Sequence, residues 1–270
     1  MTRGSADDRL ATLLAGPGRR DRLTHVEHVP ARAGERVPWP GWVGADVRAA
    51  LQSHGVEQPW RHQVEAAEAV WSGRHTVIAT GTASGKSLAY LMPALTAALG
   101  EPAGTTLYLS PTKALAADQL RAVSRLGLAG LRAAGFDGDT PTESRDWVRQ
   151  HATYVLTNPD MLHRSVLPGH ARWARFLRQL QYVVVDECHR YRGVFGSHVA
   201  SVLRRLSRVC AHYGGSPVFI LTSATVTEPE VSAARLVGHE VVPVTDDGSP
   251  RGELLFALWE PPLTDLAGEH

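Results

Sequence analysis

Cysteine is almost absent from this chain of 270 residues, which contains only Cys188 and Cys210. Two cysteines are too few for a zinc site or a disulfide framework. Their scarcity is typical of a reducing compartment, so we expect a cytoplasmic protein. The 13 histidines show no ligand-like spacing with cysteine or with paired carboxylates. We therefore interpret them as ordinary surface or core residues.

Long apolar runs and an excess of one charge are also missing. No run approaches the ~20 apolar residues that a membrane-spanning helix needs. The first residues, MTRGSADDRLATLLAG, lack the apolar core of a signal peptide, so no membrane partner is expected. The net charge is only +1, and no global basic field indicates nucleic acid. A hydrophobic content of 43% and a charged content of 20% are typical of a globular protein with a sizeable core.

The chain is organised around residues 75–91, HTVIATGTASGKSLAYL. Residues 75–80 are apolar and β-branched, which predicts a buried strand. Small residues follow at 81–85, and a helix is expected from Lys86-Ser87. Such a loop folds tightly around an anion, and the helix N-terminus directs free N–H groups and a positive dipole end at it. The predicted phosphate-binding residues are Thr80, Gly81, Thr82, Ala83, Ser84, Gly85, Lys86 and Ser87.

Lys86 would add a full charge for the β- and γ-phosphates of a nucleoside triphosphate, and Ser87 a hydroxyl for Mg²⁺. The strict pattern G-x-x-x-x-G-K-[ST] has glycine where this chain has Thr80. A chance glycine-rich turn is the alternative interpretation. The strand before the loop and the helix after it favour a P-loop.

Short apolar strands alternate with helices along the chain. Further strands are predicted at 105–110, 131–136, 152–157, 182–186 and 217–221, with 254–259 as an edge strand or the start of a connection. Helices are predicted at 7–14, 43–54, 60–71, 114–126, 142–150 and 196–213. This alternation is typical of an α/β fold with a mostly parallel sheet covered by helices on both faces. In such sheets the ligand lies beyond the carboxyl ends of the strands, where the polar clusters of this chain fall.

An acidic pair follows the nearly all-apolar strand at 182–186. An acid at this place is what a Mg²⁺–triphosphate site requires opposite a P-loop serine. Asp186 would hold Mg²⁺, and Glu187 would orient and deprotonate the attacking water. The alternative is an ordinary strand-to-loop junction, which the P-loop earlier in the chain makes the weaker interpretation.

Lys86-Ser87, Asp186-Glu187-Cys188-His189 and Ser223-Ala224-Thr225, in this order and spacing, resemble motifs I, II and III of superfamily 2 helicases of the DEAD/DEAH type. Gln63 is similar to the family's adenine-reading glutamine. The resemblance covers roughly 43–262 and also includes PTKAL (111–115), DGDT (137–140) and TNPD (157–160). The run 191–198, YRGVFGSH, resembles a subgroup of DEXH helicases, the mitomycin-repair type, which carries a C-terminal cysteine-rich domain.

The resemblance implies a RecA-like motor domain with ATP and Mg²⁺ as cofactors. Catalysis would fall to Lys86, Asp186, Glu187 and His189, and Gln63 would bind adenine. His189 and the Ser223-Ala224-Thr225 cluster would couple hydrolysis to movement. The backbone of single-stranded or partly duplex DNA, with RNA as the alternative, would be contacted by Pro111, Thr112, Lys113, Asp139, Thr140, Asn158 and Pro159. For Lys113 an ordinary surface lysine is the alternative.

The sequence departs from the family pattern after Thr225. No Q-x-x-G-R-x-G-R run, which would carry an arginine finger, follows it, and the subgroup's cysteine cluster is absent. We therefore expect an N-terminal extension (1–42), one RecA-like domain (43–262), and a linker or the start of a missing second domain (263–270). For 1–42 we expect loosely packed, solvated chain, with an arginine-rich nucleic-acid arm as the alternative.

The leading functional hypothesis is the ATP-binding motor domain of a DNA helicase or translocase, weak or inactive alone. A second is a module that binds nucleotide and nucleic acid without turnover. A third is a P-loop kinase or another NTPase, against which the Ser-Ala-Thr and Pro-Thr-Lys clusters argue.

Overall fold

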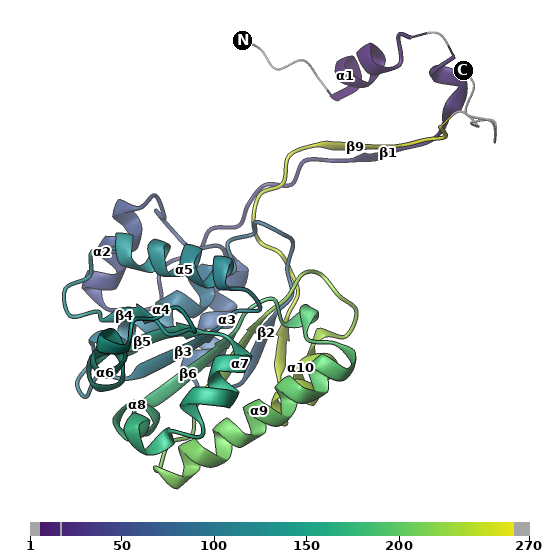
Figure 1. Ribbon diagram of the computed structural model, residues 1–270. Helices are drawn as coiled ribbons and strands as arrows, with labels where there is room; N and C mark the ends of the chain where they lie inside the picture. The colour runs from purple at the N-terminus through teal and green to yellow at the C-terminus, as the bar shows by residue number, and fades with distance from the viewer. Residues whose placement is uncertain (1–5, 17, 262–270) are drawn as a thin grey trace. The chain divides into compact units, whose positions relative to one another are not determined.

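The computed structural model describes residues 6–16 and 18–261, which form two compact units (Figure 1). Unit 2 is Arg36–Gly248, and unit 1 joins Met1–Glu35 to Ser249–His270. The predicted domain 43–262 differs from unit 2 at both ends. At its start, Trp39 and Trp42 pack against a core cluster, and Trp42 stacks on Trp71 with ring centroids 4.4 Å apart. The predicted segment 263–270 lies outside the described residues.

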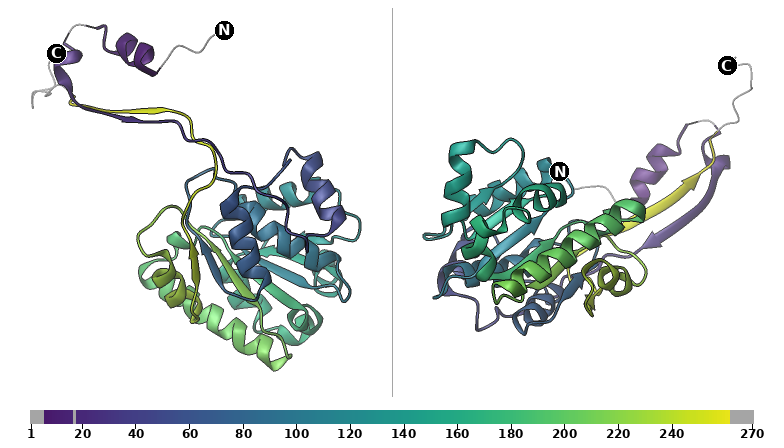
Figure 2. Two further views of the ribbon diagram at one scale, coloured as in Figure 1. Left: turned by 180° about the vertical axis from the view of Figure 1, so that it is seen from behind. Right: turned by 60° about the horizontal axis from the view of Figure 1, so that its bottom comes forward.

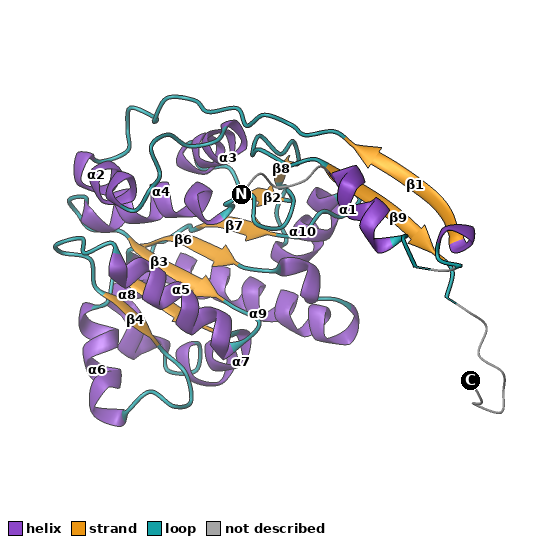
Figure 3. Cartoon of the chain, turned by 90° about the horizontal axis from the view of Figure 1, so that it is seen from above, coloured by secondary structure: helices purple, strands orange, loops and turns teal. Residues whose placement is uncertain are grey.

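A parallel sheet of seven strands forms the centre of unit 2 (Figure 3). Its order is β4-β5-β3-β6-β7-β2-β8, and every neighbouring pair is parallel. The strands are β2 (Thr76–Ile78), β3 (Thr105–Leu109), β4 (Ala133–Gly135), β5 (Tyr154–Thr157), β6 (Leu180–Val185), β7 (Val218–Thr222) and β8 (Val242–Val244). The predicted fold class is confirmed.

Helices cover both faces of the sheet (Figure 2). Val77 and Leu107 belong to one core cluster, while Ile78 and Tyr108 belong to the other, because successive strand side chains point to opposite faces. One face carries α2 (Ala45–Ser53), α3 (Arg61–Trp71), α4 (Ser87–Leu99) and α5 (Lys113–Arg125). The other carries α6 (Thr142–His151), the short helices between 159 and 178, α9 (Gly193–His212) and α10 (Pro229–Val237).

A two-stranded antiparallel ribbon dominates unit 1. β1 (Leu23–Val29) pairs with β9 (Leu254–Trp259), and α1 (Ala6–Leu13) precedes β1. The N-terminal segment, expected to be loosely packed and solvated, contains a strand that was not predicted, and most residues of this strand are exposed. Residues 254–259 do form a strand, but its partner is β1 and not the main sheet. The pairing joins segments more than 200 residues apart in the chain, which local sequence patterns do not reveal.

Most predicted elements are present within a few residues of their expected bounds. α9 begins at Gly193, earlier than the expected residue 196, and α10 and β8 were not predicted at all. Within the described part of the chain, no helix is both long and apolar enough to cross a membrane.

Candidate nucleotide site and nucleic-acid interface

The P-loop connects the end of β2 to the start of α4, and its backbone explains its small residues. Gly85 has φ +79°, and a Cβ there would lie 2.6 Å from Gln63 Nε2. Only glycine meets both conditions without strain. Ala83 has φ +62°, a left-handed value that is uncommon for alanine. Ser87 is the first residue of α4, so the helix N-terminus lies at the loop as expected.

Thr80, the departure from the strict pattern, forms a bond that glycine would lack. Its buried Oγ1 lies 2.7 Å from Ser84 Oγ across the loop. Lys86 Nζ donates to the Thr80 and Gly81 carbonyls at 3.0 and 2.9 Å. The loop is therefore closed on itself by its own side chains.

Gln63, predicted to bind adenine, is buried and bonded within the protein. Its Oε1 accepts from the Trp60 N–H at 2.8 Å, which caps α3. Its Nε2 donates to the carbonyls of Gly85 at 2.9 Å and Ser84 at 3.3 Å. Gln63 therefore connects α3 to the P-loop through hydrogen bonds.

A loop after β8, which the sequence did not predict, lies against the start of α3 and the P-loop. The Gly248 N–H donates to Nδ1 of the buried His62 at 3.1 Å. Burial lowers the pKa of His62 and keeps its imidazole neutral, so that Nδ1 accepts. Asp247 Oδ2 lies 3.0 Å from where a Gly81 Cβ would be. The sequence offered no signal for this loop, because β8 was not predicted.

Burial lowers the pKa of Lys86, and the carboxylates of Glu187, Asp186 and Asp247 oppose that shift. The three acids come from the ends of two other strands of the sheet. In a parallel sheet these ends share one edge, which brings Lys86 and the acidic pair together as predicted.

Asp186 is held by two hydroxyls that the sequence reasoning did not identify. Tyr108 Oη and Thr222 Oγ1 both donate to its carboxylate. Burial raises the pKa of Tyr108, so its hydroxyl stays a proton donor. Both residues lie on strands next to β6, and their signal was only the apolar strand pattern around them.

His189 connects motif II to motif III. Its Nε2 lies 3.2 Å from Glu187 Oε2, and its Nδ1 accepts from the Ala224 N–H at 3.1 Å. Glu187 has φ +51°, and its N–H donates to Thr222 Oγ1 at 3.2 Å. Ser223 is buried and its side chain interacts with the Cys188 thiol, whereas Thr225 is exposed. The Ala224 contact is through the backbone, so any small residue would supply it.

The side chains at this edge of the sheet fit ATP and Mg²⁺. Asp186 and Ser87 supply only oxygen atoms, the hard ligands that Mg²⁺ prefers together with phosphate and water. Among the described residues, no group of three or more His, Cys, Asp or Glu could hold a metal alone.

The predicted nucleic-acid residues lie at the other end of the same edge. Thr112, Lys113 and Asn158 line one small depression of about 100 Å³ together with Asp137. Thr112 caps α5 by accepting from the Leu115 N–H, and Asn158 accepts from the Met161 N–H. Both side-chain oxygens therefore cap the helices that follow them. Pro111, Asp139, Thr140 and Pro159 do not line this depression.

Lys113 is paired with Asp139. Its Nζ donates to Asp139 Oδ2 at 2.6 Å, and this hydrogen bond raises the pKa of Lys113. Thr140 Oγ1 accepts from the Asp137 N–H at 2.9 Å and closes that turn.

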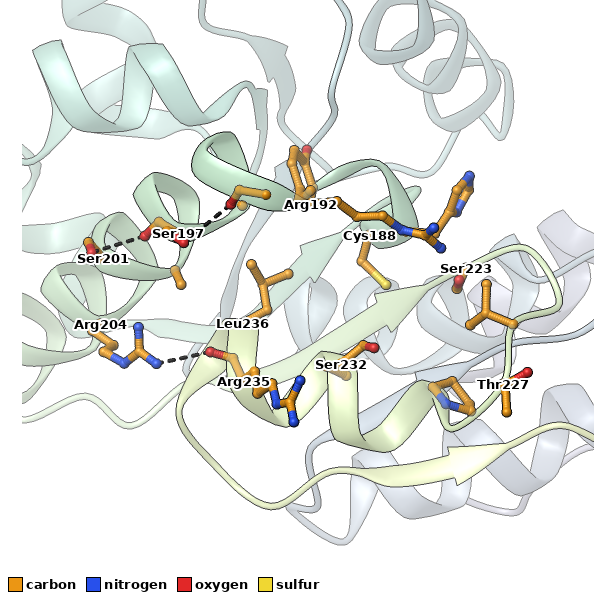
Figure 4. A pocket seen from close by; sticks show the side chains of 18 residues that line it. Cys188, Arg192, Ser197, Ser201, Arg204, Ser223, Thr227, Ser232, Arg235 and Leu236 are labelled. Carbon is orange, nitrogen blue, oxygen red and sulfur yellow. Dashed lines mark hydrogen bonds between the residues drawn. The ribbon is translucent and has the colours of Figure 1, made fainter.

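A hollow of about 940 Å³ lies beside motifs II and III, between α9 and α10 (Figure 4). Cys188, His189 and Ser223 line it, and at one end Arg204 donates to the Arg235 carbonyl at 2.9 Å. Burial raises the pKa of Cys188 to about 12, so it is no thiolate nucleophile.

The fold and this edge define a RecA-like P-loop nucleotide-binding domain. The DEAD/DEAH box helicase family matches residues 60–233, more than half of the chain. The chain belongs to the DEAD/DEAH box helicase family.

Curated and solved relatives agree. The chain is 38% identical over 260 residues to the uncharacterized ATP-dependent helicase YprA of Bacillus subtilis, covering 95% of this chain and 35% of YprA. It is 43% identical over 215 residues to the ATP-dependent helicase HRQ1 of Saccharomyces cerevisiae, and this match covers 77% of this chain and 20% of HRQ1. A crystal structure of the DUF1998 helicase MrfA bound to DNA superimposes with a TM-score of 0.90 at 38% identity, covering 97% of this chain and 37% of MrfA. The chain thus spans about a third or less of these proteins.

Proposed function

We propose that this chain is the ATP-binding motor domain of a DNA helicase or translocase. The observation that supports this proposal is a set of connected polar contacts near Lys86. Asp186, Thr222 and the Glu187 N–H are joined by hydrogen bonds, Glu187 lies 3.2 Å from His189, and His189 accepts from the Ala224 N–H. These contacts link the end of β6 to the end of β7. They include the two acids that ATP hydrolysis needs, Asp186 for Mg²⁺ and Glu187 for the attacking water.

The proposed roles follow from these contacts. Ser87 and Asp186 would hold Mg²⁺, which would neutralise charge on the triphosphate. Lys86 leaves the loop carbonyls for the β- and γ-phosphates. Glu187 orients the attacking water and takes its proton, with His189 fixing the carboxylate. Since His189 also accepts from Ala224, movement of Glu187 is transmitted to the start of the segment after β7.

Gln63 binds adenine in this proposal only if its P-loop bonds loosen. Thr82, Ala83, Ser84 and Gly85 surround the phosphates. Pro111, Thr112, Lys113, Asp139, Thr140, Asn158 and Pro159 contact the backbone of a single strand, a task that suits short polar side chains and helix starts. DNA is favoured over RNA because a similar helicase, MrfA, has been solved bound to DNA. A role in DNA repair and a cytoplasmic location remain parts of the proposal, the latter supported by two free cysteines.

We infer that a second RecA-like domain in cis completes the site by supplying an arginine finger. Without such a group the rate falls by ~10³–10⁵. The chain 1–270 alone is therefore expected to bind ATP weakly, to hydrolyse it slowly and not to separate strands.

The test measures ATPase activity of the chain with and without single-stranded DNA, for wild type and Glu187→Gln. We expect a slow, DNA-stimulated rate that Glu187→Gln abolishes while ATP binding remains. Absence of any stimulated rate would favour the module without turnover. Robust unwinding by the chain alone would contradict the inferred need for a second domain.

A further inference from the structure

We propose that a cationic groove along α9 extends the nucleic-acid path beyond the edge of the sheet. Two depressions of about 480 and 430 Å³ lie beside α9, one toward its start and one toward its end. Arg205 and Arg208 line both, so the two depressions are adjacent. We call this feature the α9 groove; its other wall is the chain from α7 (Pro159–Met161) to His170 (Figure 1).

The groove carries an excess of positive charge. Arg164, Arg205 and Arg208 line it against a single acid, Asp160. None of these three arginines has an ion pair or a side-chain hydrogen bond in the described chain. On the opposite face of unit 2, by contrast, Arg36, Arg61 and Arg121 are paired with Glu57, Glu65 and Asp118. The net charge of +1 therefore hides a local excess of unpaired cations.

The spacing of the donors suits a repeating anion. His198, Arg205 and His212 are seven residues apart on α9, so they lie on one side of the helix about two turns from each other. From Phe195 to His212 the helix rises about 25 Å. That length matches roughly seven phosphates of a stacked strand. Imidazole and guanidinium groups both donate hydrogen bonds to phosphate oxygens.

The occupant we assign is a single strand of nucleic acid, for two reasons. Pro159 and Asp160 line the upper end of the groove and directly follow Asn158, so a strand leaving the proposed sheet-edge contacts enters here. Phe195 lines the same end and is 49% exposed. An exposed aromatic ring beside cations is a stacking platform for a base. An acidic protein segment would use the arginines but would not need the ring.

The experiment compares two oligothymidines by fluorescence anisotropy with the full chain. The short one covers only the sheet edge, and the long one exceeds it by about seven nucleotides. The double variant Arg205→Gln/Arg208→Gln is expected to bind the long oligonucleotide about tenfold more weakly and to bind the short one with unchanged affinity. The slope of log affinity against log salt should fall by about 1.4, or 0.7 for each lost phosphate contact. Phe195→Leu should weaken the long one several-fold without changing the slope.

The matched control is Arg48→Gln/Arg74→Gln, which removes the same charge from exposed positions at α2 and before β2. It should leave both oligonucleotides bound as in wild type. Equal binding of the long oligonucleotide by wild type and Arg205→Gln/Arg208→Gln would overturn the proposal. So would arginine-dependent capture of polyglutamate, but not DNA, which would assign the groove to an acidic segment.

The inference rests on the proposed nucleic-acid binding, but different results would contradict each of them. If wild type binds both oligonucleotides and the arginine substitutions do not weaken binding of the long one, the groove is refuted and the sheet-edge contacts stand. If wild type binds neither oligonucleotide, both proposals are refuted. A normal thermal unfolding midpoint for each variant excludes misfolding as the cause.

Discussion

Tyr108 and Thr222 determine the orientation of the Asp186 carboxylate. Both hydroxyls lie behind the carboxylate on neighbouring strands, and both donate to it. A carboxylate restrained in this way loses little conformational entropy when it meets Mg²⁺. The two hydroxyls therefore matter to the nucleotide site although neither would touch the nucleotide.

Tyr108→Phe tests this. It removes one hydrogen bond to a charged acceptor, which is worth about 2 kcal/mol. We expect the free energy of unfolding to fall by about that amount in urea titrations, and ATP–Mg²⁺ to bind more weakly. Calorimetric titration measures the second effect.

The control is Tyr191→Phe. The Tyr191 hydroxyl is also buried but has no partner in the described chain. Its removal should not lower stability, because a buried hydroxyl without a partner contributes no hydrogen bond and costs desolvation energy. An equal loss in both variants would mean that the Tyr108 bond contributes nothing specific.

Among the elements, the start of α5 and the turn after β4 interact through one exposed ion pair. Lys113 pairs with Asp139, so a phosphate that binds Lys113 must displace a carboxylate or tolerate it nearby. Asp139→Asn removes the competing negative charge and keeps a short polar side chain that can still contact the strand. We expect single-stranded DNA to bind a few-fold more tightly, with a steeper salt dependence by about 0.7. Lys113→Ala should show the opposite change, and weaker binding by Asp139→Asn would show that Asp139 positions Lys113.

Elements with strong local patterns were predictable, and those without them were not. The buried strand before Asp186 is nearly all apolar, and α9 repeats apolar residues at helical spacing, so both were found. β8 has the sequence VPV, in which proline disfavours a strand, and β1 depends on a partner more than 200 residues away.

In the site, Lys86, the acidic pair and His189 were brought together as expected because parallel strands end at one edge. Tyr108, Thr222, His62 and Asp247 were missed. Their roles come from strand neighbours and from a loop whose position depends on the sheet order, which local sequence does not specify. The inward bonds of Gln63 were missed for the same reason.

At the scale of the molecule, both core clusters lie within unit 2, whereas the ribbon of unit 1 has a largely uncovered apolar face. Leu254, Phe256 and Leu258 alternate along β9 and are each about half exposed. Removing residues 1–35 would leave β9 without its partner, and an unpaired apolar strand is prone to aggregate.

We expect the truncation 36–270 to form soluble aggregates, and 36–248, which lacks β9 as well, to be monomeric. The unfolding midpoint of 36–248 should match that of the full chain, because no core residue is lost. Size-exclusion chromatography with light scattering and thermal denaturation measure both. A monomeric 36–270 would contradict the argument from the unpaired strand.

The whole chain contains only two lysines, Lys86 and Lys113, one in each proposed ligand site. Amine acetylation followed by mass spectrometry therefore reports on both sites at once, with the N-terminal amine as the reference. ATP–Mg²⁺ should protect Lys86 and leave Lys113 reactive, while oligothymidine should do the reverse.

Since the Asp139 hydrogen bond raises the pKa of Lys113, less of its amine is neutral and reactive at a given pH. Asp139→Asn should therefore speed Lys113 acetylation without DNA and leave the rate at Lys86 unchanged. Protection of both lysines by either ligand alone would show that the nucleotide and nucleic-acid sites are not separate.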